Sequence, residues 1–263
     1  AEIPETVVIT EKRKRRWPPG IPQILALILV LIIDSLVSDN FFSVQIREGR
    51  LFGSPIDILN RAAPVAILSL GMTLVIATGG IDLSVGAVMA ISGATAVSMM
   101  VAGHSLPVVI GVALLSGVVC GLWNGILVAI LKIQPFVATL ILMVAGRGIA
   151  QLITQGQIVT FDNPSLAWLG SGSLAGLPVP VWITLLIALL TGLLVRKTAL
   201  GLFLEATGIN LRAARNAGVN GAVIVIVAYV ISGLCAAVAG IIVAADIRAA
   251  DANNAGLWLE LDA

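Results

Sequence analysis

The stretch from Leu83 to Leu131 constrains this chain most, because it carries no charged residue when His104 is neutral. A helix needs roughly 20 apolar residues to cross a bilayer, so this run is about twice a single span. It must turn back, and Gly103–Pro107 is its turn-like segment. Charged residues make up 11% of the chain, against about 25% in soluble domains. These features predict an integral membrane protein.

Apolar segments recur along the whole sequence and predict an all-α fold, a polytopic transmembrane helical bundle. The two-residue alternation of an outer-membrane barrel is absent. The net charge of +1 also gives no support to a nucleic-acid partner. The expected spans are 21–38, 56–78, 81–102, 107–131, 135–155, 178–195 and 221–245.

The basic run KRKRR at 12–16 predicts the orientation, because cytoplasmic segments carry an excess of Lys and Arg. Residues 1–20 are therefore expected to be a cytoplasmic basic N-terminus, and residues 21–263 a single transmembrane domain. Threading from that start places most loop cations inside, namely Lys132, Arg196, Lys197, Arg212 and Arg215, and leaves Arg47, Arg50 and Arg248 outside.

Small residues recur at every fourth position in three segments, and this spacing predicts close contacts between helices. Cys120 and Cys235 lie in apolar sequence and are expected to be buried thiols. The three sets are Gly86, Ala90 and Ala94; Gly117, Gly121 and Gly125; and Ser232, Ala236 and Gly240.

The segment ATGGIDLSVG (77–86) places Asp82 between glycines inside apolar sequence. Gly79 and Gly80 give up helix readily, and an acidic residue is stabilised at the start of a new helix. We therefore expect a discontinuous helix near residues 79–86. Asp82 can simply cap the restart, with Ser84 nearby, or the break can line a solute path or gate, as in transporters.

Two more polar residues lie inside predicted spans. Arg147 should face the bundle interior or a cavity with a partner, or else extend towards the nearer surface. Asn124 can bond across helices or line the path. Catalysis is not expected, because no nucleophile has a plausible base, a lone histidine supports no metal site, and no GxxxxGK[ST] phosphate loop occurs.

The inside segment 198–220 contains a short predicted helix. Asn210 is the expected N-cap and Gly218 the expected stop, so Arg212, Arg215 and Asn216 share an exposed face. This helix can be an ordinary connection or a docking site for a cytoplasmic partner.

Several segments together are similar to the permease subunits of bacterial ABC sugar importers of the ribose type. Within that family, LFGSPIDILNRAAPVA (51–66) and the segment 245–263 most resemble the galactofuranose importers. The other matching pieces are GMTLVIATGGIDLSVGAVMA (71–90), QPFVATL (134–140), the GRG around Arg147, WLGSG (168–172) and GINLRAARNAGVN (208–220).

The resemblance implies a transport subunit rather than an enzyme, located in the bacterial inner membrane. It implies a second permease chain in a heterodimer, a cytoplasmic subunit that binds ATP and Mg²⁺, and a periplasmic sugar-binding protein. The solute would be a monosaccharide, with galactofuranose expected. The family's ATPase-coupling helix maps onto Glu205, Gly208, Asn210, Arg212, Arg215, Asn216 and Gly218.

Two departures from the family pattern stand out. Leu204, Glu205 and Gly208-Ile-Asn210 occupy positions where ribose permeases tend to carry a tyrosine and Gly-Gly-Asn. The sequence also stops at Ala263, where the family continues with further helices, so a partial chain is expected. Two rival functions stay open at this point: an ion-coupled secondary transporter that uses Asp82 and Arg147, and a membrane scaffold without transport.

Overall fold

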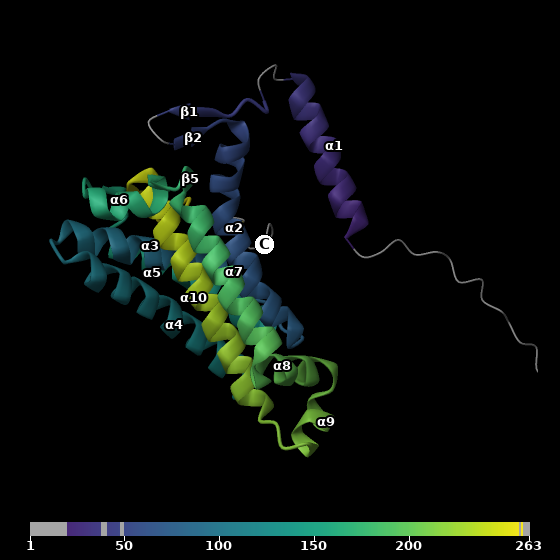
Figure 1. The fold of residues 1–263 in the computed structure, drawn as a ribbon. Helices are drawn as coiled ribbons and strands as arrows, with labels where there is room; N and C mark the ends of the chain where they lie inside the picture. Colours follow the sequence, from purple (N-terminus) through teal and green to yellow (C-terminus); the bar gives the residue numbers. More distant parts are fainter. Residues whose placement is uncertain (1–19, 38–40, 48–49, 258, 260–263) are drawn as a thin grey trace, which may run out of the picture. The chain divides into compact units, whose positions relative to one another are not determined.

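A computed structural model of the chain describes residues 20–37, 41–47, 50–257 and 259. The all-α prediction is confirmed, since helices form most of the described chain and the strands are short (Figure 1). The helices are α1 (Ile21–Val37), α2 (Ser54–Ala77), α3 (Val85–Val101), α4 (Leu106–Ala129), α5 (Pro135–Ile153), α6 (Pro164–Ser171), α7 (Val179–Lys197), α8 (Ala199–Ile209), α9 (Leu211–Asn216) and α10 (Gly221–Ile247).

The strands form three antiparallel pairs in the loops. They are β1 (Gln45–Arg47) with β2 (Arg50–Phe52), β3 (Val159–Thr160) with β6 (Ala249–Ala250), and β4 (Ser173–Leu174) with β5 (Leu177–Pro178).

The chain divides into two compact units, residues 1–43 and 44–263. In the first, α1 is an apolar helix of 17 residues. The basic run at 12–16 lies outside the described residues, and the predicted boundary between 1–20 and 21–263 stays a prediction.

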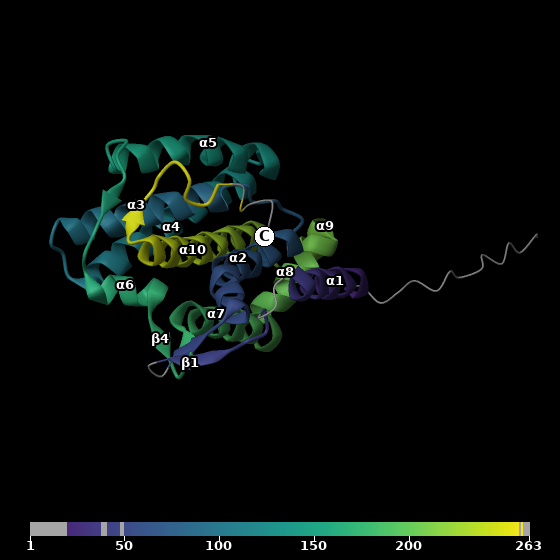
Figure 2. The ribbon, with the colours of Figure 1, turned by 90° about the horizontal axis from the view of Figure 1, so that it is seen from above.

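In the second unit, α10 occupies the centre. It packs against α2, α3, α4 and α6, and Figure 2 shows it between α3 and α4 on one side and α2 and α7 on the other. Its Ala228, Tyr229, Ala236 and Ala239 side chains are fully buried. An apolar helix with this much buried surface is the core element around which the shorter spans assemble.

Small residues bring α4 and α10 close together, as the fourfold spacing predicts. A side chain at Gly117 would contact Gly233, one at Gly121 would contact the Tyr229 carbonyl, and one at Gly125 would lie 2.9 Å from the Ile226 Cα. The residue numbers rise along α4 while they fall along α10, so the two helices are antiparallel. The predicted tight helix packing is confirmed here.

The predicted spans agree with the observed helices to within a few residues. Within the described residues, α2, α4, α5, α7 and α10 are long and apolar enough to cross a membrane, while α1 and α3 are shorter apolar helices of 17 residues. The turn predicted at 103–107 is present, because α3 ends at Val101 and α4 begins at Leu106.

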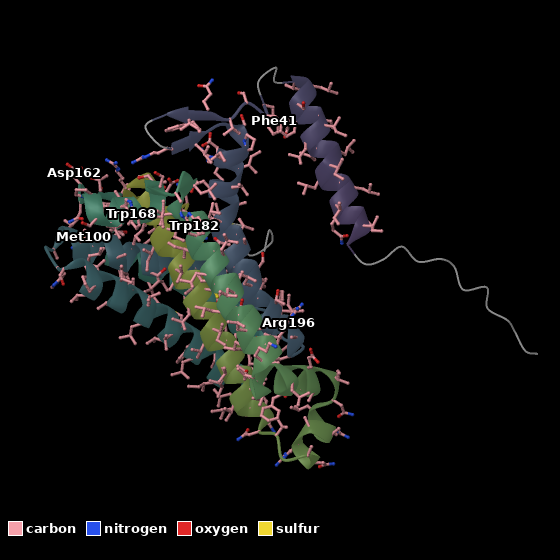
Figure 3. All side chains as sticks on the ribbon, viewed as in Figure 1. Phe41, Met100, Asp162, Trp168, Trp182 and Arg196 are labelled. Carbon is pink, nitrogen blue, oxygen red and sulfur yellow. The ribbon has the colours of Figure 1, made fainter. Side chains whose placement is uncertain are left out.

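The two ends of this unit carry different side chains. Trp168 and Trp182 lie at the end where α6 and the strands gather, and Arg196 lies towards the opposite end, where α8 and α9 are found (Figure 3). Apolar side chains on α5 and α7 are exposed along the length of these helices, for example Val144 at 68% and Leu189 at 59%. Tryptophan at an interface and apolar surface between the ends are typical of a membrane protein.

Candidate functional site

The predicted break between residues 79 and 86 is present. Helix α2 ends at Ala77 and α3 begins at Val85, with seven residues between them that form no helix. Gly79 has φ +79°, a conformation that favours glycine. At Gly80, a Cβ atom would lie 3.0 Å from the Tyr229 hydroxyl. The glycine pair is therefore required both for the turn and for the close approach of α10.

Asp82 lies inside the bundle and is 2% exposed. Its Oδ1 accepts hydrogen bonds from the Ser84 backbone N–H at 3.0 Å and the Ser84 hydroxyl at 2.6 Å. Its Oδ2 accepts a bond from the Ser232 hydroxyl on α10 at 2.8 Å. The carboxylate thus stabilises the turn before α3 and fixes this turn to α10. The N-cap position of α3 is Ser84 and no side chain caps the helix, so the expectation that Asp82 caps the restart is wrong.

A third helix joins the same cluster. The Asn124 side-chain amide of α4 donates to the Ser84 hydroxyl at 2.8 Å, and the Tyr229 hydroxyl donates to the Ile81 carbonyl at 2.9 Å. We call the buried group of Asp82, Ser84, Asn124 and Ser232 the Asp82 hub. The Asn124 Oδ1 atom is buried and has no hydrogen-bond partner among the described residues.

The hub lies near the middle of the bundle. Ser232 follows the first residue of α10, Gly221, by eleven positions, which is about 16 Å along a helix axis. Fifteen positions, or about 22 Å, separate it from Ile247 at the other end. The chain therefore re-enters the bundle after α2, and α3 starts at mid-depth rather than at a surface.

Ser232 and Tyr229 were not predicted as members of this cluster. Ser232 was assigned only to a small-residue stripe, and Tyr229 to no role. The signal available was that Tyr229 is the chain's single tyrosine and lies within an apolar span. A buried tyrosine hydroxyl normally has a hydrogen-bond partner. The place of Tyr229 within an apolar span therefore indicated a polar contact inside the bundle.

Arg147 lies on α5, beside the chain segment that follows α10. It projects from α5, and its guanidinium donates to the Ala255 carbonyl. The next polar residue on the same face, Gln151, donates to Asn253 Oδ1 at 2.7 Å. Arg147 thus has a partner other than the lipid surface, as a charge within a span requires. The hydrogen-bond donors to Asp82 come from Ser84 and Ser232.

The predicted short helix is present as α9, while Glu205 and Gly208 lie in the preceding helix α8, and the coupling role of these residues stays a prediction. Asn210 is its N-cap, and Asn210 Oδ1 accepts bonds from the backbone N–H groups of Arg212 and Ala213, both at 3.0 Å. Gly218 follows with φ +86° and ends the motif. Asn210 satisfies two N–H groups that the first turn leaves without helical partners.

A groove of about 760 Å³ lies beside α9, with Lys132, Arg212 and Arg215 among its lining residues. The sequence did not predict α8, which precedes α9. A Cβ atom at Gly208 of α8 would contact the Ala77 carbonyl. The helix pair α8–α9 therefore touches the end of α2, next to the break.

Comparison with known proteins agrees with these features. Residues 54–263 match the family described as the permease component of branched-chain amino acid transport systems. The chain is 71% identical to the galactofuranose transporter permease protein YtfT of Escherichia coli K12, over 99% of this chain and 76% of the relative.

Two relatives of lower identity carry the names of sugar import permeases. Identity to the fructose import permease protein FruF of Bifidobacterium longum is 40%, over 90% of this chain and 68% of the relative. Identity to the ribose import permease protein RbsC of Escherichia coli K12 is 37%, over 95% and 76%. No solved structure matches the chain. These findings confirm the resemblance to ribose-type permeases.

Proposed function

Because this chain belongs to the family of permease components of branched-chain amino acid transport systems, we propose that it is the permease subunit of an ATP-driven importer of galactofuranose. The observation that carries this proposal is the 71% identity to a galactofuranose transporter permease over 99% of the chain. The chain is a multi-pass membrane protein and a transport subunit, and the chemistry of ATP hydrolysis belongs to another chain.

Three kinds of partner complete the proposed transporter. A cytoplasmic subunit binds ATP and Mg²⁺, a periplasmic protein delivers the sugar, and a second, different permease chain completes the path. The N-terminus faces the cytoplasm of a bacterial inner membrane. The groove cations Lys132, Arg212 and Arg215 place positive charge at the α9 end of the bundle, which supports a cytoplasmic position for that end.

Contacts along α8 and α9 suggest how ATPase motion reaches the membrane. The ATPase docks on α9, where the exposed residues Arg212 and Arg215 offer positive charge. Displacement of α9 moves α8, and Gly208 transmits that motion to the end of α2 at Ala77. Gly79 and Gly80 follow after Thr78. The break therefore absorbs the change in backbone angle while α3 stays attached to α10 through the Asp82 hub.

The proposed path and gate residues divide into three roles. Gly79 and Gly80 supply the flexible part of the break. The hub residues Asp82, Ser84 and Asn124 hold the start of α3 beside α4 and α10. Arg147 fixes the segment that follows α10.

Uptake by proteoliposomes tests this function. The vesicles contain the whole transporter, with ATP enclosed and the sugar-binding protein outside, and the probe is ¹⁴C-labelled galactose, whose solution form includes the furanose. We expect uptake that requires enclosed ATP and continues after ionophores collapse all ion gradients. Uptake that proceeds without ATP and stops with the ionophores would instead show an ion-coupled transporter, and no uptake by an intact assembly would favour a scaffold.

A further inference from the structure

Polar side chains gather on one face of α5 and on the chain that follows α10. Gln151, Asn253 and Asn254 are exposed, although α5 also exposes apolar residues such as Leu152 at 79%. Gln151 Nε2 donates to Asn253 Oδ1 at 2.7 Å, and Asn254 Nδ2 donates to Asp251 Oδ2 at 2.7 Å. We call Gln151, Asp251, Asn253 and Asn254 the amide face.

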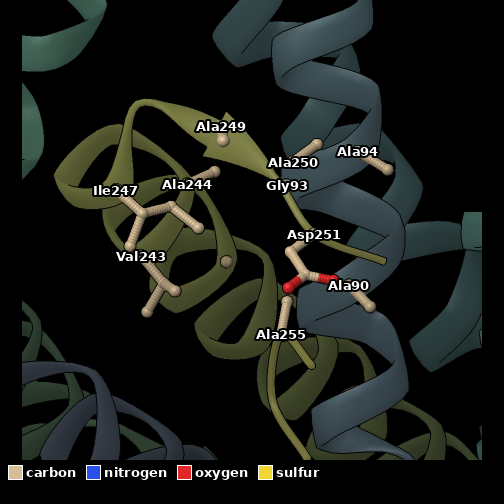
Figure 4. Close-up of a pocket in the computed structure, with 11 residues that line it drawn as sticks. Ala90, Gly93, Ala94, Val243, Ala244, Ile247, Ala249, Ala250, Asp251 and Ala255 are labelled. Atoms are coloured by element: carbon tan, nitrogen blue, oxygen red, sulfur yellow. The ribbon is translucent and has the colours of Figure 1, made fainter. Parts of the chain in front are cut away.

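The segment that carries this face returns into the bundle. After β6 it runs along α3, where Ala250 and Ala255 line one small pocket together with Ala90 and Ala94 of α3 (Figure 4). A Cβ atom at Gly256 would contact the backbone of Gly86. From Ala94 to Gly86 the segment descends eight residues of α3, or about 12 Å.

Views from above place residues 251–257 between α3 and α5 (Figure 2). Gly86 is the second residue of α3 and therefore lies one turn above the Asp82 hub. The returning segment thus reaches from the α6 end of the bundle to within a turn of its polar centre. The break between α2 and α3 and this second non-helical segment approach the same depth from opposite ends.

Backbone contacts fix the returning segment, so its side chains present a defined surface. Arg147 donates to the Ala255 carbonyl, and the Asp251 carboxylate accepts bonds from the backbone N–H groups of Asn253 at 3.1 Å and Asn254 at 3.2 Å. Gly256 has φ +67°. Non-helical backbone at membrane depth is tolerated where it is buried in protein or lines a watery cavity.

The chemistry of the amide face fits hydroxyl groups. An amide side chain has an acceptor oxygen and a donor NH₂ group, so the bond between Gln151 and Asn253 leaves Gln151 Oε1 as an acceptor and Asn253 Nδ2 as a donor. A sugar hydroxyl both donates and accepts. Exposed amides facing acyl chains would lose their hydrogen bonds to water at a cost of kilocalories each, so this face meets water, a polar ligand or polar groups of another protein segment.

We propose that Gln151, Asp251, Asn253 and Asn254 form a contact surface for the hydroxyl groups of a neutral monosaccharide within the transport path. The solute meets this surface between the α6 end of the bundle and the Asp82 hub. Arg147 is a positioning residue that holds the surface through the Ala255 carbonyl. This inference deepens the proposed function and rests on it for the identity of the solute.

Thiol labelling tests the surface without relying on transport. Asn253→Cys and Gln151→Cys are introduced separately into the complete transporter. Membranes carrying each variant, with both faces accessible to the reagent, are then treated with a charged methanethiosulfonate. The native Cys120 and Cys235 are buried and give a low background. The matched control is Leu115→Cys, because Leu115 is 57% exposed on apolar α4.

We expect fast labelling at 253 and 151, slow labelling at 115, and at least a threefold slowing at 253 when galactose is delivered by the binding protein. Equal labelling rates at positions 253, 151 and 115 would overturn the proposal, because they would show that the amide face is no more accessible to water than the apolar control position. Labelling at 253 only when the chain is made without its partners would show a contact between chains and would also overturn the proposal.

Uptake by the variants completes the test. Asn253→Leu and Gln151→Leu should each lower ¹⁴C-galactose uptake at least fivefold per assembled transporter, with assembly unchanged, while Leu115→Ala keeps normal uptake. Normal uptake by both amide variants would refute the contact surface but leave the proposed function intact. Absence of ATP-driven uptake by the unmodified transporter would refute the proposed function, and with it the assignment of a sugar to this face.

Discussion

Replacing Asp82 separates its structural role from a role as a charge carrier. Asp82→Ala removes the acceptor for three buried hydrogen bonds, two from Ser84 and one from Ser232. The Ser232 bond joins two helices, and such bonds in membrane proteins average about 0.6 kcal/mol and reach about 1.7 kcal/mol. The two local bonds from Ser84 contribute about 0.5–1.5 kcal/mol each, so the three bonds together give about 2–5 kcal/mol. We therefore expect the alanine variant to lose that amount of unfolding free energy.

Asp82→Asn provides the matched comparison. The asparagine oxygen still accepts both bonds from Ser84, and its NH₂ group can donate to the Ser232 hydroxyl, which can rotate to accept. We expect a loss of no more than about 1 kcal/mol, because one bond is rearranged and none is left without a partner. ATP-driven uptake should persist, since this role of the side chain requires an acceptor rather than a negative charge.

Thermal unfolding in mild detergent, followed by tryptophan fluorescence, measures the difference. For a chain of this size, 2–5 kcal/mol corresponds to a lower midpoint by roughly 5–15 °C for the alanine variant, and asparagine should lie within a few degrees of the parent. Equal destabilisation by both variants would refute the hydrogen-bond account. Loss of uptake by a stable, fully assembled asparagine variant would instead identify Asp82 as a charge relay.

Three further changes test the packing and the coupling helix. Gly121→Leu should separate α4 from α10 and destabilise the protein by at least about 1–3 kcal/mol, while Gly111→Leu, with open space around it, should change the melting midpoint little. Asn210→Ala removes the cap of α9, which costs about 1 kcal/mol locally, and should lower sugar-stimulated ATPase activity without affecting the melting of the bundle. Arg212→Glu combined with Arg215→Glu should reduce co-purification of the ATPase subunit severalfold, and unchanged recovery with unchanged stimulated activity would count against docking at α9.

Local sequence patterns predicted the features that depend on neighbouring residues. Asn210 and Gly218 delimit α9 because capping acts over a few positions. The break at Asp82 follows from the Gly-Gly pair, and the glycine spacing on α4 identifies the face that meets α10. Each of these is determined within one or two helical turns, so one sequence was sufficient.

Contacts between distant segments could not be predicted in the same way. Ser232 reaches Asp82 across 150 residues of sequence, and Ala255 reaches Arg147 across 108. No periodicity specifies such pairs, because they depend on how the helices assemble. The return of residues 251–257 into the bundle was also missed, since its Asn-rich sequence is typical of a solvated loop.

A density map of the complete transporter in a lipid nanodisc tests the central claim most directly. The account predicts that residues 78–84 are non-helical and that Asp82 lies at mid-membrane depth, with its carboxylate between the Ser84 and Ser232 hydroxyls and no lipid beside it. A continuous helix through residue 82, with its side chain directed at the acyl chains, would contradict the account.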